Sequence, residues 1–408
     1  MTHGQHAGQS GLHSAPAVRR TVAAILLPLI LATVVGIVLL WPDGDTPRIP
    51  GAQRADATIL DIQECALPAD TESGEACPEA TVRIDSGPDR GIEVVIPLPF
   101  GEGAPVFRAG DAVVIGAAAD QPIESRYELI DQQRAWPLLA LAVTFVLAVV
   151  ALSRWRGLAA LAGLALSVLI LIVFVLPALL DGKPPLAVAV VGASAIMICT
   201  LYISHGVSLR TSVSLVGTLI SLGLTGLIGL LFTTVGRFTG LGDESAPYLA
   251  SLGLNIDLRG LLLAGLVIGA LGVLDDVTVT QTAAVWELAN ADSTASRRSL
   301  FSAGLRIGRE HVSATVNTLV LAYAGASLPL LLLFVGSGQG PLDTVTTELV
   351  AQEVVRALVG GLGIVAAVPV TTLVAALAVR EQPRPSRGRR ARAVVKTLDS
   401  RSSPSVVS

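Results

Sequence analysis

The stretch GALGVLDDVTVTQ, residues 269–281, ends one of the long apolar runs that decide the fold of this chain. Two adjacent carboxylates, Asp275 and Asp276, interrupt the run, and a cluster of threonine and glutamine side chains follows at once. A run of this kind is typical of a helix that crosses a membrane, because a bilayer core of about 30 Å needs about 20 apolar residues. The question is whether the helix ends at the acids or carries a site there.

The composition points to several such helices. Of 408 residues, 52% are hydrophobic and 15% are charged, and the mean hydropathy is +0.67. These values exclude a disordered chain and are atypical of a soluble protein. We predict an α-helical polytopic membrane protein with about eight transmembrane helices. A signal-anchor helix covers residues 19–41 and a seven-helix membrane domain residues 133–380. The runs are 21–41, 136–153, 157–180, 185–204, 211–235, 259–277, 312–335 and 351–379.

Basic residues set the expected orientation, because cytoplasmic loops carry an excess of lysine and arginine. With the N-terminus inside, the short outer loops carry only Lys183, Arg237 and Arg259. The inner segments carry the larger set, which is Arg19, Arg20, Arg154, Arg156, Arg210, Arg297, Arg298, Arg306, Arg309 and the arginines of the C-terminal tail. This bias predicts a bacterial plasma-membrane protein with both termini in the cytoplasm.

Residues 42–132 form the sizeable segment that we predict outside the membrane. We expect a small extracytoplasmic β-rich domain, barrel or OB-like, between helices 1 and 2. Over residues 43–131 there are 18 Asp and Glu against 6 Arg, a balance that either attracts cations or basic partners or serves solubility. Turn signals separate the strand-like runs, which are ATILDI (57–62), ATVRID (80–85), IEVVIPL (92–98), DAVVIG (111–116) and YELID (127–131).

Cysteine use agrees with this topology. Cys65 and Cys77 both lie in the outer segment, and we expect a disulfide between them because that compartment is oxidising. Cys199 lies in a membrane run and is interpreted as a small packing residue. Residues 1–18 and the basic residues 381–408 are predicted to be disordered cytoplasmic segments, the latter placed on anionic lipid.

Asp275 and Asp276 are the first candidate site. If the helix continues, Asp276 shares a face with Thr280. Two carboxylates with hydroxyl oxygens nearby are hard oxygen ligands for a proton, Na⁺ or a divalent ion such as Mg²⁺. The alternative is a helix end at the membrane surface, where water solvates the acids.

A second polar cluster follows in GLRIGREHVSATVNTLVLAYAG, residues 304–325. Gly304 and Gly308 form a small-xxx-small pair that permits close helix approach. Glu310, His311 and Asn317 then enter the seventh span from the same membrane face as Asp275 and Asp276, so that the two spans could share a site. The alternative is a capped helix start, with Asn317 in an interhelical hydrogen bond.

Glu353 and Arg356, at the outer start of the last span, are the third candidate. Their i,i+3 spacing predicts an ion pair on one face of the helix. The more specific alternative is that the pair forms a gate on the outer side of the membrane. The strings PAL (177–179) and GLGD (240–243) evoke intramembrane aspartyl proteases, but their order is reversed and no tyrosine–aspartate pair occurs. We therefore expect no enzyme. The sequence shows no phosphate-binding loop and no zinc-ligand spacing, so we expect no metal and no cofactor.

The region from residue 265 to 336 carries a recognisable pattern. GLVIGALGVLDDVTVTQTAAVWEL and then SAGLRIGREHVSATVNTLVLAYAGASLPLLLLF resemble the YibE/F family of bacterial multi-pass membrane proteins. The last span, EVVRALVGGLGIVAAVPVTTLVAAL, is similar to the ending of that family. The resemblance covers about residues 136 to 380 and implies a helical membrane protein. The resemblance does not identify a catalytic residue in this chain.

Three functional hypotheses follow. The first is a secondary transporter or exporter of a small solute or ion, with proton coupling as one option, in which Asp275, Asp276, Glu310, His311 and Asn317 form the site at a broken or closely packed helix pair. The second is a membrane sensor or scaffold that binds a partner through the outer domain. An intramembrane enzyme ranks last. The bilayer is the expected environment, nucleic acid is not an expected partner, and an oligomer is possible.

Overall fold

The computed structural model describes residues 16–44, 53–64, 78–117, 122–123, 126–242, 248–249, 256–338 and 340–379. The predicted Cys65–Cys77 disulfide and the predicted tail 381–408 lie outside the described residues. Residues 16–18, which we expected in a disordered segment, already belong to the first helix, α1 (Pro16–Leu39). The chain divides into two compact units, one of Met1–Pro47 with Ala159–Ser408 and one of Arg48–Leu158.

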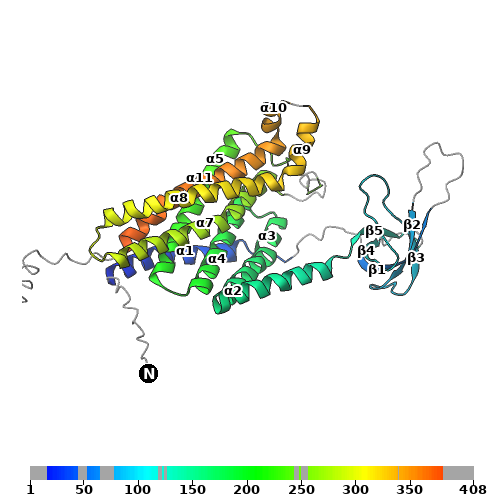
Figure 1. The fold of residues 1–408 in the computed structure, drawn as a ribbon, viewed down its shortest axis with the longest axis horizontal. Helices are drawn as coiled ribbons and strands as arrows, with labels where there is room; N and C mark the ends of the chain where they lie inside the picture. Colours follow the sequence, from blue (N-terminus) through cyan, green and yellow to red (C-terminus); the bar gives the residue numbers. More distant parts are fainter. Residues whose placement is uncertain are drawn as a thin grey trace, which may run out of the picture. The chain divides into compact units, whose positions relative to one another are not determined.

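The first unit is helical (Figure 1). Helices α5, α7, α8 and α11 run side by side, and α4 packs on α7. Besides α1, its elements are the end of α2 (Ala135–Ile170), the π-helix η1 (Leu171–Val175), α3 (Leu176–Leu180), α4 (Pro185–His205), α5 (Leu209–Val235), α7 (Leu258–Ala291), α8 (Arg297–Ala326), α9 (Leu328–Gly336), α10 (Pro341–Thr346) and α11 (Glu348–Ala378).

Within the described residues, six helical segments are long and apolar enough to cross a membrane, or seven if α8 and α9 form one bent span. The prediction of eight spans divides Ala135–Leu180 into two spans. Length and composition alone count this 46-residue segment as one candidate span. Arg154 inside it has a non-helical backbone (φ 51°, ψ −128°), which divides α2 into two helical stretches near the predicted boundary. The number eight stays a prediction.

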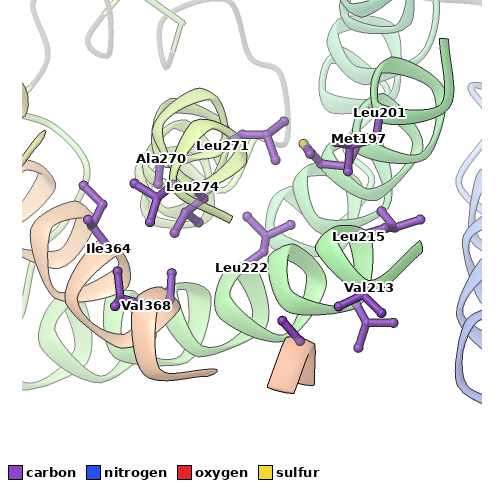
Figure 2. Close-up of a cluster of buried hydrophobic side chains, with 14 of the residues drawn as sticks. Met197, Leu201, Val213, Leu215, Leu222, Ala270, Leu271, Leu274, Ile364 and Val368 are labelled. Carbon is purple, nitrogen blue, oxygen red and sulfur yellow. The ribbon is translucent and has the colours of Figure 1, made fainter. Parts of the chain in front are cut away.

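The core of the helical unit lies between α4, α5, α7 and α11 (Figure 2). Leu274 of α7 faces Leu222 of α5, and Ile364 and Val368 approach from α11. These side chains are almost completely covered by protein. The apolar surface on the outside of the helices, in contrast, is extensive, as a lipid environment requires.

Two predicted spans belong to longer helices. The run that we ended at residue 277 lies in α7, which continues to Ala291 because Val277, Gln281 and Val285 pack inward at helical spacing. We also predicted a span over residues 312–335. The helix α8 instead begins at Arg297, where the Ser296 side chain caps the Ser299 amide, and α9 bends from it by 62°.

The second unit contains a curled antiparallel sheet with the strand order β3-β2-β1-β4-β5. The five predicted strand segments are all strands, and the edge strands β3 and β5 contact each other. The more specific barrel or OB-like fold stays a prediction. The strands are β1 (Gln53–Glu64), β2 (Pro78–Ile84), β3 (Glu93–Pro97), β4 (Ala112–Ala117) and β5 (Tyr127–Gln132).

Alternation explains why these residues form this sheet. Ala80, Val82 and Ile84 of β2 are buried while the residues between them are less covered, so that one face of the strand forms a core. Val82 pairs with Ile59 of β1 and with Val94 of β3 across the sheet. The inward face is aliphatic in β1 to β4 and carries Tyr127 in β5, and this one-sided burial fixes the register.

A turn between β2 and β3 is tied to β5 by a carboxylate. The Tyr127 hydroxyl donates to Asp89 Oδ2 at 2.5 Å, and Arg126 Nη1 donates to the same oxygen at 3.0 Å. The hydrogen bond from Tyr127, followed by the bond from Arg126, holds the pKa of Asp89 below its ordinary value of 3.8.

Asp89→Asn should loosen this turn at neutral pH. Because the pKa of Asp89 is lower in the folded than in the unfolded chain, its stabilisation is present above pH 3.8 and is lost as the pH falls through the lowered value. Amide hydrogen exchange of peptides covering β2 and β3 should be faster in the variant at pH 7, and the difference should shrink below the ordinary pKa. An equal difference at both pH values would contradict this origin.

Candidate functional site

The interior of the helical unit contains a seam of hydroxyl side chains along α5. Thr218, Ser221 and Thr225 are completely buried, and each hydroxyl donates to the carbonyl oxygen four residues earlier, at 2.8–3.0 Å. Such bonds satisfy the hydroxyl proton within the helix itself. Small hydroxyl side chains also let neighbouring helices approach closely. The seam therefore combines close packing with a polar interior.

One hydrogen bond joins α5 to α7 within this seam. The hydroxyls of Thr218 and Thr278 lie 2.5 Å apart, and either can be the donor. Thr278 lies two residues after Asp276 of α7. The segment that opened the sequence analysis is thus fixed against α5 on its buried side.

Gln281 connects three helices. Its Nε2 donates to the Gly304 carbonyl of α8 and to Thr372 Oγ1 of α11, both at 2.7 Å. The side chain is 3% exposed, so this amide is paired where water cannot replace its partners. The sequence analysis noticed Gln281 without assigning it to the site, although an amide in an apolar helix was a signal for such a link.

Gly304 and Gly308 do permit the close approach that their spacing predicts. A Cβ atom at Gly304 would lie 2.9 Å from Thr372 Cγ2, and one at Gly308 would clash with Val368 Cγ1 and lie 2.8 Å from Gln281 Oε1. The two glycines thus let α8 pack closely against α7 and α11. In this packing, His311 of α8 faces Asp276 of α7.

Asp275 and Asp276 lie inside α7 and not at its end. The helix continues for fifteen residues beyond Asp276, to Ala291. Asp275 is partly buried, and its Oδ1 atom is covered and has no hydrogen-bond partner within the described part of the chain. Its neighbour Asp276 is exposed and faces α8.

His311 of α8 faces Asp276. Their Nε2 and Oδ2 atoms are 4.0 Å apart, which is beyond hydrogen-bond distance and within reach of an ion pair when the imidazole is protonated. His311 Nε2 is covered and has no hydrogen-bond partner among the described residues. Thr280, one turn from Asp276, donates its hydroxyl to the Asp276 carbonyl at 2.7 Å. Asp275 Oδ1 of α7 and His311 Nε2 of α8 are thus two covered polar atoms without a hydrogen-bond partner among the described residues.

Glu310 and Asn317 are not part of this group. Both are exposed on α8, and at about 100° per residue they lie on a face turned by about 100–120° from His311. The structure therefore brings Asp276, Thr280 and His311 together, with Asp275 beside Asp276 in the chain, and leaves Glu310 and Asn317 on another side of α8.

Glu353 and Arg356 form an ion pair on α11. The distance from Arg356 Nη1 to Glu353 Oε1 is 2.6 Å, and each side chain is about one-quarter exposed (24% and 25%). Arg356 also lines a cavity of about 480 Å³ together with Gln352 of α11, Gly265 and Gly269 of α7, and apolar residues of η1 and α3. The ion pair therefore lies beside a cavity that is lined mainly by apolar side chains.

Glu348, at the start of α11, was missed by the sequence analysis. Its Oε1 atom accepts hydrogen bonds from the Thr239 amide and hydroxyl at 2.7 Å, the Gly240 amide at 2.9 Å and Gln352 Nε2 at 3.1 Å. The carboxylate thus clamps the loop after α5 to α11. No local sequence signal joins residues more than a hundred positions apart.

The donor set of the described residues is not that of a metal centre. No three His, Cys, Asp or Glu side chains within the described ranges are grouped so that they could hold a metal ion.

The fold and this site define a polytopic α-helical protein of membrane type, with ionisable side chains in the middle of its apolar helices. Residues 141–381 match the model of the YibE/F-like protein family, so the chain belongs to that family. No curated protein and no solved structure is significantly similar to the chain.

Proposed function

We propose that this protein is a secondary transporter or exporter of a small solute or ion that is coupled to protons. It would lie in a bacterial plasma membrane with both termini in the cytoplasm. The observation that carries the proposal is the approach of Asp276 to His311 across α7 and α8, beside the unpaired Asp275 Oδ1 atom.

The position of the acids within α7 supports a functional site. At 1.5 Å per residue, Asp276 lies about 27 Å from the beginning of α7 and about 22 Å from its end. The helix therefore continues well past the acids, which do not mark its end. Ionisable groups within a membrane-type helix commonly mark ion or proton pathways.

The local chemistry favours a proton over a metal or alkali cation. Of the two arrangements that we expected, a broken or a closely packed helix pair, α7 is unbroken at the acids, so its carbonyls are engaged in helix hydrogen bonds. A cation such as Na⁺ or Mg²⁺ needs several oxygen ligands, whereas a proton needs one carboxylate or imidazole.

Transport by reconstituted protein tests this proposal. The full chain is placed in proteoliposomes with an internal pH indicator, and a panel of solutes is applied with and without a proton gradient. We expect solute-dependent proton movement in the unchanged protein and a loss of at least tenfold in Asp276→Asn and in His311→Gln.

The matched control is Glu287→Gln, which makes the same type of change on the same helix. Glu287 is 71% exposed and lies 4.0 Å from Arg210 at the other end of α7. This variant should keep its transport. Proton movement that is equal in all four proteins would remove Asp276 and His311 from the site.

A second candidate, a sensor or scaffold, has support in the sheet unit. A cavity of about 440 Å³ there is lined by Pro97, Pro99, Phe107, Asp131 and Arg134, among others. It could hold a partner segment. Deletion of residues 45–130 separates the two candidates, because transport by the helical unit should survive the deletion while partner binding should not.

A further inference from the structure

A cavity of about 480 Å³ is lined by the beginning of α7, by α11 and by the segments η1 and α3. This volume is within the range of about 300–1,000 Å³ that is typical of sites for small ligands. The walls are mainly aliphatic, with Val175 from η1, Leu179 from α3, and Leu262 and Ile268 from α7. These elements belong to the same compact unit. The proton site proposed above does not use this cavity.

Two glycines leave room for the cavity. Gly265 and Gly269 of α7 line it, and because they are four residues apart they lie on one face of the helix. A Cβ atom at Gly265 would have no heavy atom within 4 Å, so that a larger side chain at this position would extend into free space. The loop residue Gly240 lines another part of the wall, and its amide is held by Glu348. The backbone of α7 and of this loop therefore forms part of the cavity wall.

Arg356 brings the charge to this cavity. Of the described residues that line it, Arg356 and Gln352 have polar side chains, and the others are aliphatic residues or glycines. Gln352 is buried, and its Nε2 atom donates to Glu348. The side chain of Arg356 is about one-quarter exposed (24%). A ligand in the cavity therefore meets an apolar surface that carries one cationic group.

The guanidinium of Arg356 has unused hydrogen-bond donors. Its Nη1 atom donates to Glu353 Oε1 at 2.6 Å. Neither Nε nor Nη2 has a hydrogen-bond partner among the described residues, and of these two atoms Nε is covered while Nη2 is not. Nη2 is therefore the donor that a ligand can reach. Glu353 lines a separate cavity of about 140 Å³ beside Tyr323 of α8, so the two charges of the pair line different spaces.

We propose that the larger cavity binds a small amphipathic carboxylate, which has an aliphatic chain and one anionic head group. The head group accepts a hydrogen bond from Arg356 Nη2, and the chain packs against the aliphatic walls. A planar carboxylate matches the geometry of a guanidinium. A phosphomonoester, in contrast, carries a charge of about −1.5 to −2 at pH 7, and the described lining offers one cationic side chain. The proposal concerns binding and does not depend on the transport function.

Photolabelling by an aliphatic carboxylate tests the site. The full chain in phosphatidylcholine nanodiscs is irradiated with a diazirine analogue of octanoate, and labelled peptides are quantified by mass spectrometry. We expect labelling of residues 258–269 of α7 and 352–356 of α11 that excess octanoate suppresses. Excess octylamine, which has the same chain length and the opposite charge, should not suppress it. Equal suppression by both compounds, or no labelling of these residues, would overturn the proposal.

Two variants assign the labelling to this cavity. Gly265→Leu fills the cavity and keeps both charges, and Glu353→Leu/Arg356→Leu removes the guanidinium without leaving an unpaired charge. Each should lower the octanoate-sensitive labelling at least tenfold. Gly272→Leu is the matched control, because a Cβ atom there also has no heavy atom within 4 Å and Gly272 does not line the cavity. Equal labelling in Gly265→Leu and Gly272→Leu would contradict the proposal, even if the double variant does not fold.

Nanodiscs that also contain phosphatidylglycerol distinguish a free carboxylate from an anionic lipid. We expect the octanoate-sensitive labelling of the parent protein to remain unchanged in them. A loss of labelling would mean that the lipid head group occupies the cavity, and it would overturn the assignment to a carboxylate.

Discussion

Replacing Gly308 by leucine will separate α8 from α7 and α11 and sharply lower the melting temperature of the purified protein. A Cβ atom at this position would clash with Val368 Cγ1 and lie 2.8 Å from Gln281 Oε1. Overpacking of a tight interior usually costs about 1–3 kcal/mol. Here the first added atom already collides, and the displaced Gln281 also loses its bonds to α8 and α11, so the cost should lie at the upper end.

Gly325→Leu is the matched control for this change. It lies on the same helix, and no heavy atom is within 4 Å of the Cβ position. We expect its melting temperature, measured in the same detergent by thiol-reactive or tryptophan fluorescence, to remain within a few degrees of the parent protein. Equal losses in both variants would show that leucine is harmful anywhere on α8 and not through the contact at Gly308.

The second large effect should come from Arg356→Leu, which leaves Glu353 without its partner at 2.6 Å. Removing one member of a fully buried pair costs about 3–5 kcal/mol, because an uncompensated charge remains. Since both side chains are about one-quarter exposed, solvent lowers this cost towards the smaller value, about 3 kcal/mol. The melting temperature of the full chain should fall accordingly.

Removing both charges should reverse much of that loss. The double variant Glu353→Leu/Arg356→Leu leaves no charge unpaired and fills the site with apolar side chains, an exchange that is often neutral or stabilising. We expect it to melt well above the single variant. A double variant as unstable as the single one would mean that Arg356 stabilises the protein through the neighbouring cavity and not through Glu353.

The sequence predicted the elements of the fold better than their ends. Strict alternation identified β2, since Ala80, Val82 and Ile84 all face the core. Apolar runs identified the membrane-type helices, because transfer into lipid depends on composition alone. Polarity, however, does not end a helix. The sequence left open whether the helix ends at the Thr and Gln cluster, and the structure shows that the helix continues through the buried Gln281.

Signals for the correct ends were present. Asp257 and Ser296 stand directly before α7 and α8, and each accepts a hydrogen bond from an amide three residues later. Both are residue types that prefer this capping position. The bend between α8 and α9 comes just before Pro329, which cannot donate a helix hydrogen bond and restricts the preceding residue.

The sequence predicted which residues could form the candidate site, but it did not predict which of them lie together. The apposition of Asp276 and His311 agrees with the expectation that the sixth and seventh predicted spans share a polar region. The exclusion of Glu310 and Asn317 depends on how α8 is rotated, which the glycines at 304 and 308 decide through contacts on α11. The Glu348 carboxylate accepts a hydrogen bond from the Thr239 hydroxyl. These two residues are far apart in the sequence, and only the tertiary fold brings them together.

The hydroxyl seam divides hydrogen-bond donors and acceptors between the helices. Thr218, Ser221 and Thr225 donate their protons to their own helix, so that α5 presents oxygen lone pairs to its neighbours. The unused hydroxyl protons lie on the facing helices, because Thr282 of α7 and Thr371 of α11 are buried and have no hydrogen-bond partner among the described residues. A small rotation of α5 against α7 or α11 could therefore exchange hydrogen-bond partners without exposing a polar group to hydrocarbon.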